Sequence, residues 1–167
     1  MQNQQYHATP YNLEETGFYF STYEEYLQKS AENKDCFGVI IEEYFFHIID
    51  GDNCQLFNAL EVDQGSLQLW FESYECLDGD NLIRAIYLSE HLNVKMSDII
   101  DQIEDVVLFE GHAKAYVEEF AEETGLLNDL PEQLQYYFDF DAYARDLLLG
   151  GEISEIEIMG VTYVTWS

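Results

Sequence analysis

Residues 112–125 read HAKAYVEEFAEETG, which is the spacing of an amphipathic helix that ends at a glycine. Its apolar side chains recur three and four positions apart: Ala113, Tyr116, Val117 and Phe120. Gly125 stands directly after the last helical position, where glycine most easily adopts the left-handed backbone conformation. The stretch therefore predicts a helix over 112–124 with one apolar face turned inward.

The outer side of this helix carries glutamates in two rows. Glu118 precedes Glu122 by four residues, and Glu119 precedes Glu123 by the same interval. A like-charged pair at this spacing destabilises a helix by about 0.2–0.5 kcal/mol, and the last turn of a helix favours cations because of the helix dipole. Solvation explains why acids are tolerated here, but it does not explain an arrangement that opposes both rules. We interpret the glutamates as a binding feature.

The rest of the C-terminal region predicts shorter elements on both sides of this helix. They are a strand over 106–109, a helical turn from Pro131, a helix over 141–149 ended by Gly150-Gly151, and a terminal hairpin of 153–158 and 161–166.

The middle region, residues 66–104, shows helical periodicity. Apolar residues recur on one face of its first helix: Leu67, Trp70, Phe71, Tyr74 and Leu77. The Asp-Gly-Asp sequence at 78–80 should break that helix. We expect Asp80 to cap the second helix and Ser97 to cap a third one, which runs through Ile103.

The N-terminal region mixes strand and helix patterns. It predicts irregular chain over 1–16, a strand over 17–20, a helix to about Glu32, one or two strands over 37–50, a turn at 50–53 and a short helix to Leu60. The first of these helices should begin after Ser21 or Thr22, with Glu24 and Glu25 near capping-box spacing.

Together these patterns predict an α+β fold of three small domains. The expected divisions are an N-terminal α/β domain with a short antiparallel sheet (1–62), a middle helical domain (63–105), and a C-terminal domain of helices and an antiparallel hairpin (106–167). A hydrophobic fraction of 47%, with 16% aromatic residues, is enough for packed cores and excludes a disordered acidic tail.

The charge of the chain is extreme. It has 34 acidic residues against 6 Lys and Arg, a formal net charge of −28. Small domains usually carry a net charge of about 2 to 8 in magnitude, because like charges repel one another in the compact state. The acids are spread between core residues along the whole chain, with no base between Lys34 and Arg84 or between Lys114 and Arg145. This pattern favours a cationic partner, although adaptation to high salt or avoidance of nucleic acid would also produce it.

The spacing of the charges suits imitation of a DNA backbone. Residues four apart on a helix are separated by about 6 Å along its axis, and phosphates along one DNA strand are spaced on a similar scale. Duplex DNA carries one charge per roughly 1.7 Å, so 28 charges match at most about 48 Å of duplex, and a two-fold dimer about twice that length. A sphere could not display charges along such a line, so we expect an elongated molecule.

Two stretches of the C-terminal region resemble a known family. The run YVEEFAEETGLLNDLPEQL at 116–134 resembles the antirestriction motif of ArdA proteins, and YFDFDAYARDL at 137–147 is similar to a second stretch of that family. The resemblance is strong over 112–166 and weaker over 18–60, where STYEEY at 21–26 resembles some members. The N-terminal region departs from the commoner pattern, because it shows no opening strand with an Ala-Tyr-Asn turn.

The resemblance implies a cytoplasmic antirestriction protein carried by mobile genetic elements. It implies three small domains in a curved, elongated arrangement, and a homodimer formed through the C-terminal part. It implies a DNA mimic that occupies the DNA-binding groove of type I restriction-modification enzymes, in their specificity and methyltransferase subunits, and is not an enzyme.

The candidate partner-binding residues are carboxylates, and we expect none of them to dominate. The C-terminal set is Glu118, Glu119, Glu122, Glu123, Asp129 and Glu132. The acids expected to extend it from the middle region are Glu72, Glu75, Asp78, Asp80, Asp98, Asp101, Glu104 and Asp105.

Three other functions stay open at this point. An acidic immunity or chaperone-like protein for another basic partner would share the charge pattern. Halophilic adaptation would also produce an acidic surface. A carboxylate-based hydrolase would need paired acids in a polar pocket, but with 34 acids such pairs arise by density alone.

Metal, nucleic-acid and membrane functions are disfavoured. The Asp-Gly-Asp-Asn sequences at 50–53 and 78–81 lack the ligand spacing of a calcium-binding loop, and the four His residues form no zinc pattern with the cysteines. The chain lacks a basic patch, a signal peptide and a membrane-spanning run. The odd number of cysteines, Cys36, Cys54 and Cys76, suits a reducing cytoplasm, and we expect no cofactor.

Overall fold

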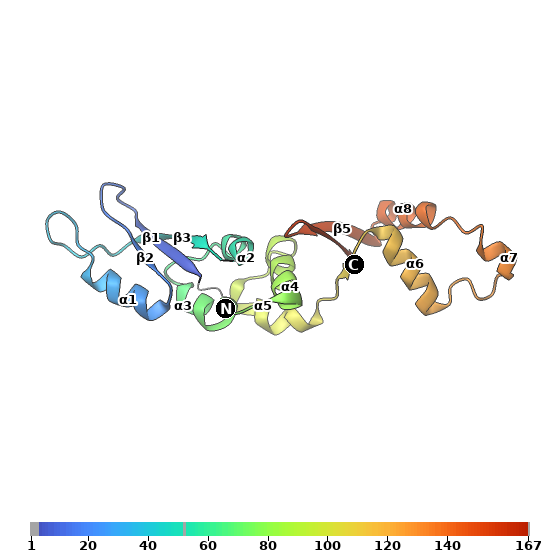
Figure 1. Cartoon of the computed structure of the whole chain (residues 1–167), viewed down its shortest axis with the longest axis horizontal. Helices are drawn as coiled ribbons and strands as arrows, with labels where there is room; N and C mark the ends of the chain where they lie inside the picture. The colour runs from blue at the N-terminus through green and yellow to red at the C-terminus, as the bar shows by residue number, and fades with distance from the viewer. Residues whose placement is uncertain (1–3, 52, 167) are drawn as a thin grey trace. The chain divides into compact units, whose positions relative to one another are not determined.

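The computed structural model describes residues 4–51 and 53–166, and it confirms the predicted α+β class. The chain divides into two compact units, Met1–Glu104 (unit 1) and Asp105–Ser167 (unit 2), each built on its own three-stranded antiparallel sheet (Figure 1). The finer division into three domains stays a prediction. Among the described residues, no helix has both the length and the apolar composition needed to cross a bilayer.

The sheet of unit 1 has the order β2-β1-β3, with β1 (Gln5–Pro10) in the centre. β2 (Phe18–Phe20) was predicted, but β1 falls where irregular chain was expected. That prediction is wrong because β1 is specified by pairing: Tyr6 lies opposite both Phe20 and Ile48, which come from distant parts of the sequence. The chain thus has an opening strand, so the expectation that it lacks one is wrong as well.

Tyr6 joins the sheet to the helices of unit 1. Its side chain is fully buried, and its ring packs against Phe20, Phe57 and Phe71 with centroid distances of 5.4, 5.6 and 5.1 Å. The indole Nε1–H of Trp70 donates a 2.9 Å hydrogen bond to the Tyr6 hydroxyl. Residues from the predicted N-terminal and middle regions therefore share one core.

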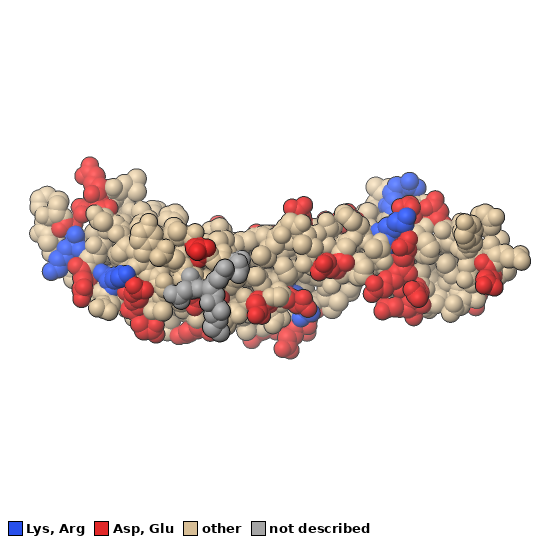
Figure 2. All heavy atoms as spheres, in the orientation of Figure 1, with Lys and Arg blue, Asp and Glu red and all other residues tan. Residues whose placement is uncertain are grey.

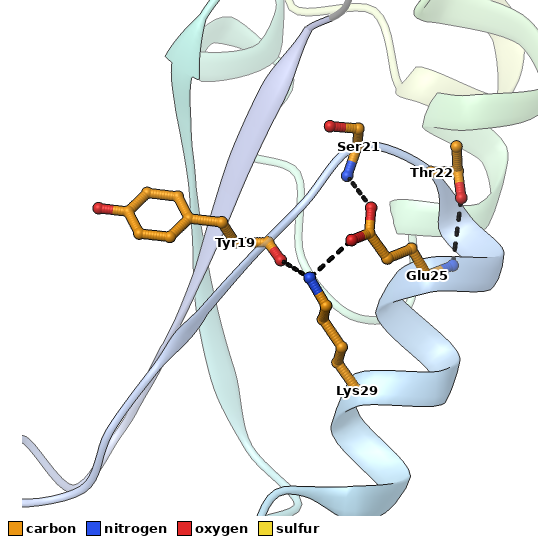
Figure 3. Close-up of polar contacts among 5 residues, drawn as sticks. All are labelled: Tyr19, Ser21, Thr22, Glu25 and Lys29. Atoms are coloured by element: carbon orange, nitrogen blue, oxygen red, sulfur yellow. Dashed lines mark hydrogen bonds and ion pairs between the residues drawn. The ribbon is translucent and has the colours of Figure 1, made fainter.

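Helix α1 (Tyr23–Glu32) begins at the predicted cap. Thr22 Oγ1 accepts a hydrogen bond from the backbone N–H of Glu25, and the Glu25 carboxylate accepts one in return from the N–H of Ser21 (Figure 3). Lys29 Nζ lies 2.6 Å from that carboxylate and also donates to the Tyr19 carbonyl oxygen. Hydrogen bonds from Lys29 and Ser21 lower the pKa of Glu25.

The rest of unit 1 is mostly helical. Its elements are β3 (Tyr44–Asp50), α2 (Cys54–Ala59), α3 (Leu67–Leu69), the π-helical turn η1 (Trp70–Tyr74), α4 (Gly79–Glu90), α5 (Met96–Gln102) and the 3₁₀ turn η2 (Ile103–Asp105), which ends at the first residue of unit 2. The strand predicted over 37–50 is confined to β3, preceded only by an isolated bridge between Lys34 and Ile40.

Two predicted helix caps are displaced by two residues. The N-cap of α4 is Asp78, and Asp80 lies in the first turn. The N-cap of α5 is Lys95, so Ser97 lies inside the helix. Both capping positions have extended backbone, and neither side chain makes a capping hydrogen bond. Asp78 and Asp80 are equally good capping types, and lysine is not one, so side-chain preference could not locate either helix start.

Unit 2 packs two helices against its sheet. The strand order is β4-β6-β5, formed by β4 (Phe109–Glu110), β5 (Ile153–Ile158) and β6 (Val161–Trp166). The two helices against the sheet are α6 (Ala113–Thr124) and α8 (Phe140–Gly150), and the short helix α7 (Glu132–Gln135) lies between them in the sequence. The buried core joins α6, α8 and the hairpin: Ala113, Val117, Ala144, Ile153 and Val164.

Most predicted elements of unit 2 are confirmed, with three corrections. The strand expected over 106–109 is the shorter β4, at Phe109–Glu110. Helix α8 begins at Phe140, one residue before the predicted start, and the carboxylate of its N-cap Asp139 accepts a hydrogen bond from the N–H of Ala142. Phe120 was expected to face inward, but it is 37% exposed, whereas Ala121 is buried. The reason is geometric, since Ala121 lies one turn after the buried Val117 and continues the core stripe. Gly125 adopts φ 65° after α6, as predicted.

Candidate acidic binding surface

The four glutamates of α6 are exposed, and they form two rows on its solvent side. Four residues of helix separate the members of each row by about 6 Å. In the described part of the chain, none of the four takes part in an ion pair. Figure 2 shows acidic side chains gathered over this helix. The arrangement leaves at least four carboxylates available to a cationic surface.

The nearby cation of α6 is already engaged. Lys114 Nζ lies 2.8 Å from Asp141 Oδ2, which joins the first turn of α6 to the first turn of α8. The hydrogen bond to Asp141 raises the pKa of Lys114, so the ammonium group stays protonated. The last two turns of α6 contain no basic residue. Lys114 also attracts Glu118, four residues further on, but it is one cation against four glutamates, so the charge of the rows is not balanced from within the helix.

Asp129 lies on the loop after α6, and Glu132 is the first residue of α7. Hydrogen bonds from a side chain stabilise the backbone of this segment. Both side chains are exposed. The side-chain amide of Gln135 donates hydrogen bonds of 3.0 Å to the carbonyl oxygens of Leu127 and Leu130. These bonds fix the backbone from which the two carboxylates project.

The other predicted carboxylates occupy helix ends and turns. Seven of them have exposed side chains: Glu72, Asp78, Asp80, Asp98, Asp101, Glu104 and Asp105. The first six belong to unit 1, and Asp105 begins unit 2. Glu72 accepts a 2.7 Å hydrogen bond from Gln68, and Asp98 accepts one of the same length from Ser97. Local neutral donors hold these two acids without reducing their charge.

Glu75 differs from the other predicted acids because it lies against the core of unit 1. Its side chain is only partly exposed, and burial raises the pKa of its carboxyl group. The Tyr6 hydroxyl is 3.4 Å from its carboxylate, and its backbone oxygen accepts a hydrogen bond from the Asn53 side chain. Glu75 therefore lies between the core and the surface, and it differs from the exposed acids in its burial and its raised pKa.

A pocket of about 540 Å³ adjoins one glutamate row of α6. It is lined by Glu119 and Glu123 together with Tyr116, Phe120 and the end of β6 at Trp166. Sequence reasoning missed it because Tyr116 and Phe120 were assigned to the core. The spacing of Tyr116, Glu119, Phe120 and Glu123 places them on one face of a helix and was the available signal.

No group of three or more His, Cys, Asp or Glu side chains in the described ranges is arranged to hold a metal ion. A family model described as "Antirestriction protein (ArdA)" matches residues 7–161 of this chain. The match includes β1 from His7 onward, β2 to β5 and the helices of both units, and it ends at Val161, the first residue of β6. No curated protein matches the chain.

Proposed function

The chain belongs to the ArdA family of antirestriction proteins, and from that premise we propose that it inhibits type I restriction-modification enzymes by imitating DNA. The proposed contact is the DNA-binding groove of the specificity and methyltransferase subunits. Members of this family act as non-catalytic inhibitors, and we propose the same for this chain.

The observation that carries the proposal is the pair of unpaired glutamate rows on α6. Four exposed carboxylates lie on two turns of helix, and no ion pair among the described residues neutralises them. Repulsion within the rows and the unfavourable helix dipole make this arrangement costly for folding. A cationic groove would relieve both costs on binding.

The physics of DNA binding explains how carboxylates would compete. DNA-binding proteins gain much of their affinity when Lys and Arg neutralise phosphates and release counterions. Carboxylates held at phosphate-like spacing would fill the same positions without offering bases or a scissile bond. Association should be fast through electrostatic steering, and it should weaken as salt is added.

The proposed surface is distributed over many acids. In unit 2 it comprises six residues of α6 and the segment that follows it: Glu118, Glu119, Glu122, Glu123, Asp129 and Glu132. In unit 1 it is extended by the exposed acids of the helical region. We expect single neutralisations to have mild effects and multiple neutralisations to act progressively.

The decisive experiment replaces the six unit 2 acids with their amides and measures inhibition of DNA cleavage by a type I enzyme. A matched variant removes the same charge from six other exposed glutamates: Glu14, Glu24, Glu32, Glu42, Glu43 and Glu61. The first variant should inhibit far less than the second. Equal inhibition by both would remove α6 and the segment after it from the binding surface.

Competition with duplex DNA separates DNA mimicry from other modes of inhibition. A DNA mimic should raise the apparent Kd of the enzyme for DNA in proportion to its own concentration. Inhibition that leaves DNA binding unchanged would contradict the proposal.

We also propose a homodimer formed through unit 2, an elongated outline, an origin on mobile genetic elements and action in the cytoplasm, as the resemblance implies. Solution scattering at several concentrations measures elongation and oligomeric state together. A monomeric, rounded particle would contradict the dimer and the elongated outline.

A further inference from the structure

The pocket beside α6 is walled by aromatic rings centred on Tyr116. The Tyr116 ring stacks on Trp166 at 5.6 Å between centroids and 20° between planes, and on Phe120 at 6.0 Å and 25°. Phe109 of β4 meets Tyr116 edge to face at 5.6 Å. Phe120 and Trp166 remain 37% and 44% exposed, so aromatic surface is open to solvent at the pocket.

Two carboxylates line the same pocket. Glu119 and Glu123 contribute to its wall, whereas Glu118 and Glu122 of the other row do not. Both lining carboxylates are exposed, and neither has an ion-pair partner among the residues that the structure describes. Aromatic surface and unpaired negative charge thus meet at one place.

This combination selects a flat cation. A guanidinium group stacks on aromatic rings, is attracted to their electron-rich faces, and donates paired hydrogen bonds to carboxylates. An ammonium group is more strongly hydrated and lacks the planar shape. A neutral apolar side chain would fill the pocket but would leave the two carboxylates without a partner.

Resting on the function proposed above, we propose that this pocket receives an arginine side chain of the basic partner protein. The arginine would act as an anchor between Trp166, Phe120 and the two carboxylates, and the glutamate rows would supply the longer-range attraction. A second copy of this chain is a poor occupant, because the whole chain holds only 6 Lys and Arg against 34 acids.

The two tryptophans of the chain provide a direct test with a built-in reference. Trp166 lies at the pocket, whereas Trp70 is fully buried in unit 1 with its Nε1–H bonded to Tyr6. The acetylated, amidated peptide Gly-Arg-Gly is titrated while the two indole N–H signals are followed by NMR. The Trp166 signal should shift saturably and the Trp70 signal should stay in place. The same peptide with citrulline, which keeps the planar shape but lacks the charge, should give no saturable shift, and the lysine peptide should bind more weakly.

Two double variants distinguish the effect of the pocket on peptide affinity from the effect of overall charge. E119Q/E123Q and E118Q/E122Q remove equal charge from the same helix, but only the first pair lines the pocket. Peptide affinity should fall about threefold to tenfold in E119Q/E123Q and clearly less in E118Q/E122Q, which removes only longer-range attraction. Phe120→Leu should also weaken binding. An absent shift of Trp166, equal binding of citrulline, or equal weakening in both double variants would overturn the proposal.

Two further outcomes have clear meanings. A Trp166 signal that moves on dilution without peptide, together with loss of peptide binding at high protein concentration, would mean that a second copy covers the pocket, which would overturn the arginine assignment. Failure of the wild-type protein to inhibit a type I enzyme would refute the proposed function. Because the peptide titration contains no restriction enzyme, its result distinguishes the two failures.

Discussion

The carboxylate of Glu155 accepts a hydrogen bond from the backbone N–H of Ala113 at 2.6 Å, so a residue of β5 caps the first turn of α6. The N-cap residue itself, His112, makes no side-chain capping bond, and its Nδ1 lies 3.6 Å from the same carboxylate. The acids of this chain therefore fall into two groups: some hold the fold, and others face solvent without a partner.

Loss of the Glu155 cap should destabilise unit 2. Glu155→Ala removes the acceptor for the Ala113 N–H and should lower the free energy of unfolding by about 1 kcal/mol, the usual cost of a lost helix cap. Urea unfolding followed through NMR signals of unit 2 measures this change. Glu157→Ala is the control, because Glu157 is exposed two residues further along β5. Equal effects of the two substitutions would show that the cap contributes nothing specific.

Glu25 should make the stability of unit 1 depend on pH. Its pKa is lowered from the ordinary value of 4.5 by the hydrogen bonds from Lys29 and the Ser21 N–H. The unfolded chain then binds more protons than the folded chain near pH 4.5, so the stabilisation is present above that pH and is lost as the pH falls through the lower folded value. The measurement is urea unfolding of the wild type and Glu25→Gln from pH 7 to 4.

The matched control for this titration is Glu24→Gln. Glu24 is exposed in the same helical turn, and its substitution removes the same charge. The difference in free energy of unfolding between the wild type and Glu25→Gln should shrink on acidification. The corresponding difference between the wild type and Glu24→Gln should change less. Parallel behaviour of the two differences would contradict a specific contribution from Glu25.

Local signals made α6 and its end predictable from the sequence. The apolar spacing of the helix and Gly125 at φ 65° depend only on neighbouring residues. β1 was not predictable in this way, because Tyr6 gains its place from Phe20, Ile48 and the distant Trp70. Strand pairing and core contacts between remote residues leave little trace in a single stretch of sequence.

The candidate site shows the same contrast. Exposure of Glu118 and Glu122 follows from helix periodicity alone. The partly buried position of Glu75 and the capping role of Glu155 follow from contacts with Tyr6 and Ala113, which only the folded chain brings together. A pattern of acids predicts charge, but it does not separate acids that bind a partner from acids that hold the fold.

The turn between β5 and β6 offers a stabilising substitution. Met159 and Gly160 have φ of 53° and 77°, the signs of a type I′ hairpin turn. Methionine tolerates this conformation poorly, whereas Asn-Gly is the preferred pair. The free energy of unfolding of Met159→Asn should exceed that of Met159→Ala by about 0.5–1 kcal/mol, since asparagine tolerates the left-handed conformation better than alanine. A thermal unfolding midpoint for the Asn variant at or below that of the Ala variant would contradict the turn assignment.

The glutamate rows of α6 should show a conflict between stability and binding. E118Q/E122Q relieves one like-charged pair and removes a negative charge from the last turn, but it also removes the attraction between Glu118 and Lys114, so unit 2 should gain about 0.5 kcal/mol at low salt. The gain should disappear near 1 M salt, where the screening length is only about 3 Å. The same variant should inhibit a type I enzyme less well than the wild type at low salt. Urea unfolding and cleavage inhibition, measured on the same samples at both salt concentrations, test the two effects together. A variant that gains no stability, or that gains stability and inhibits as well as the wild type, would show that repulsion between Glu118 and Glu122 is not retained for binding.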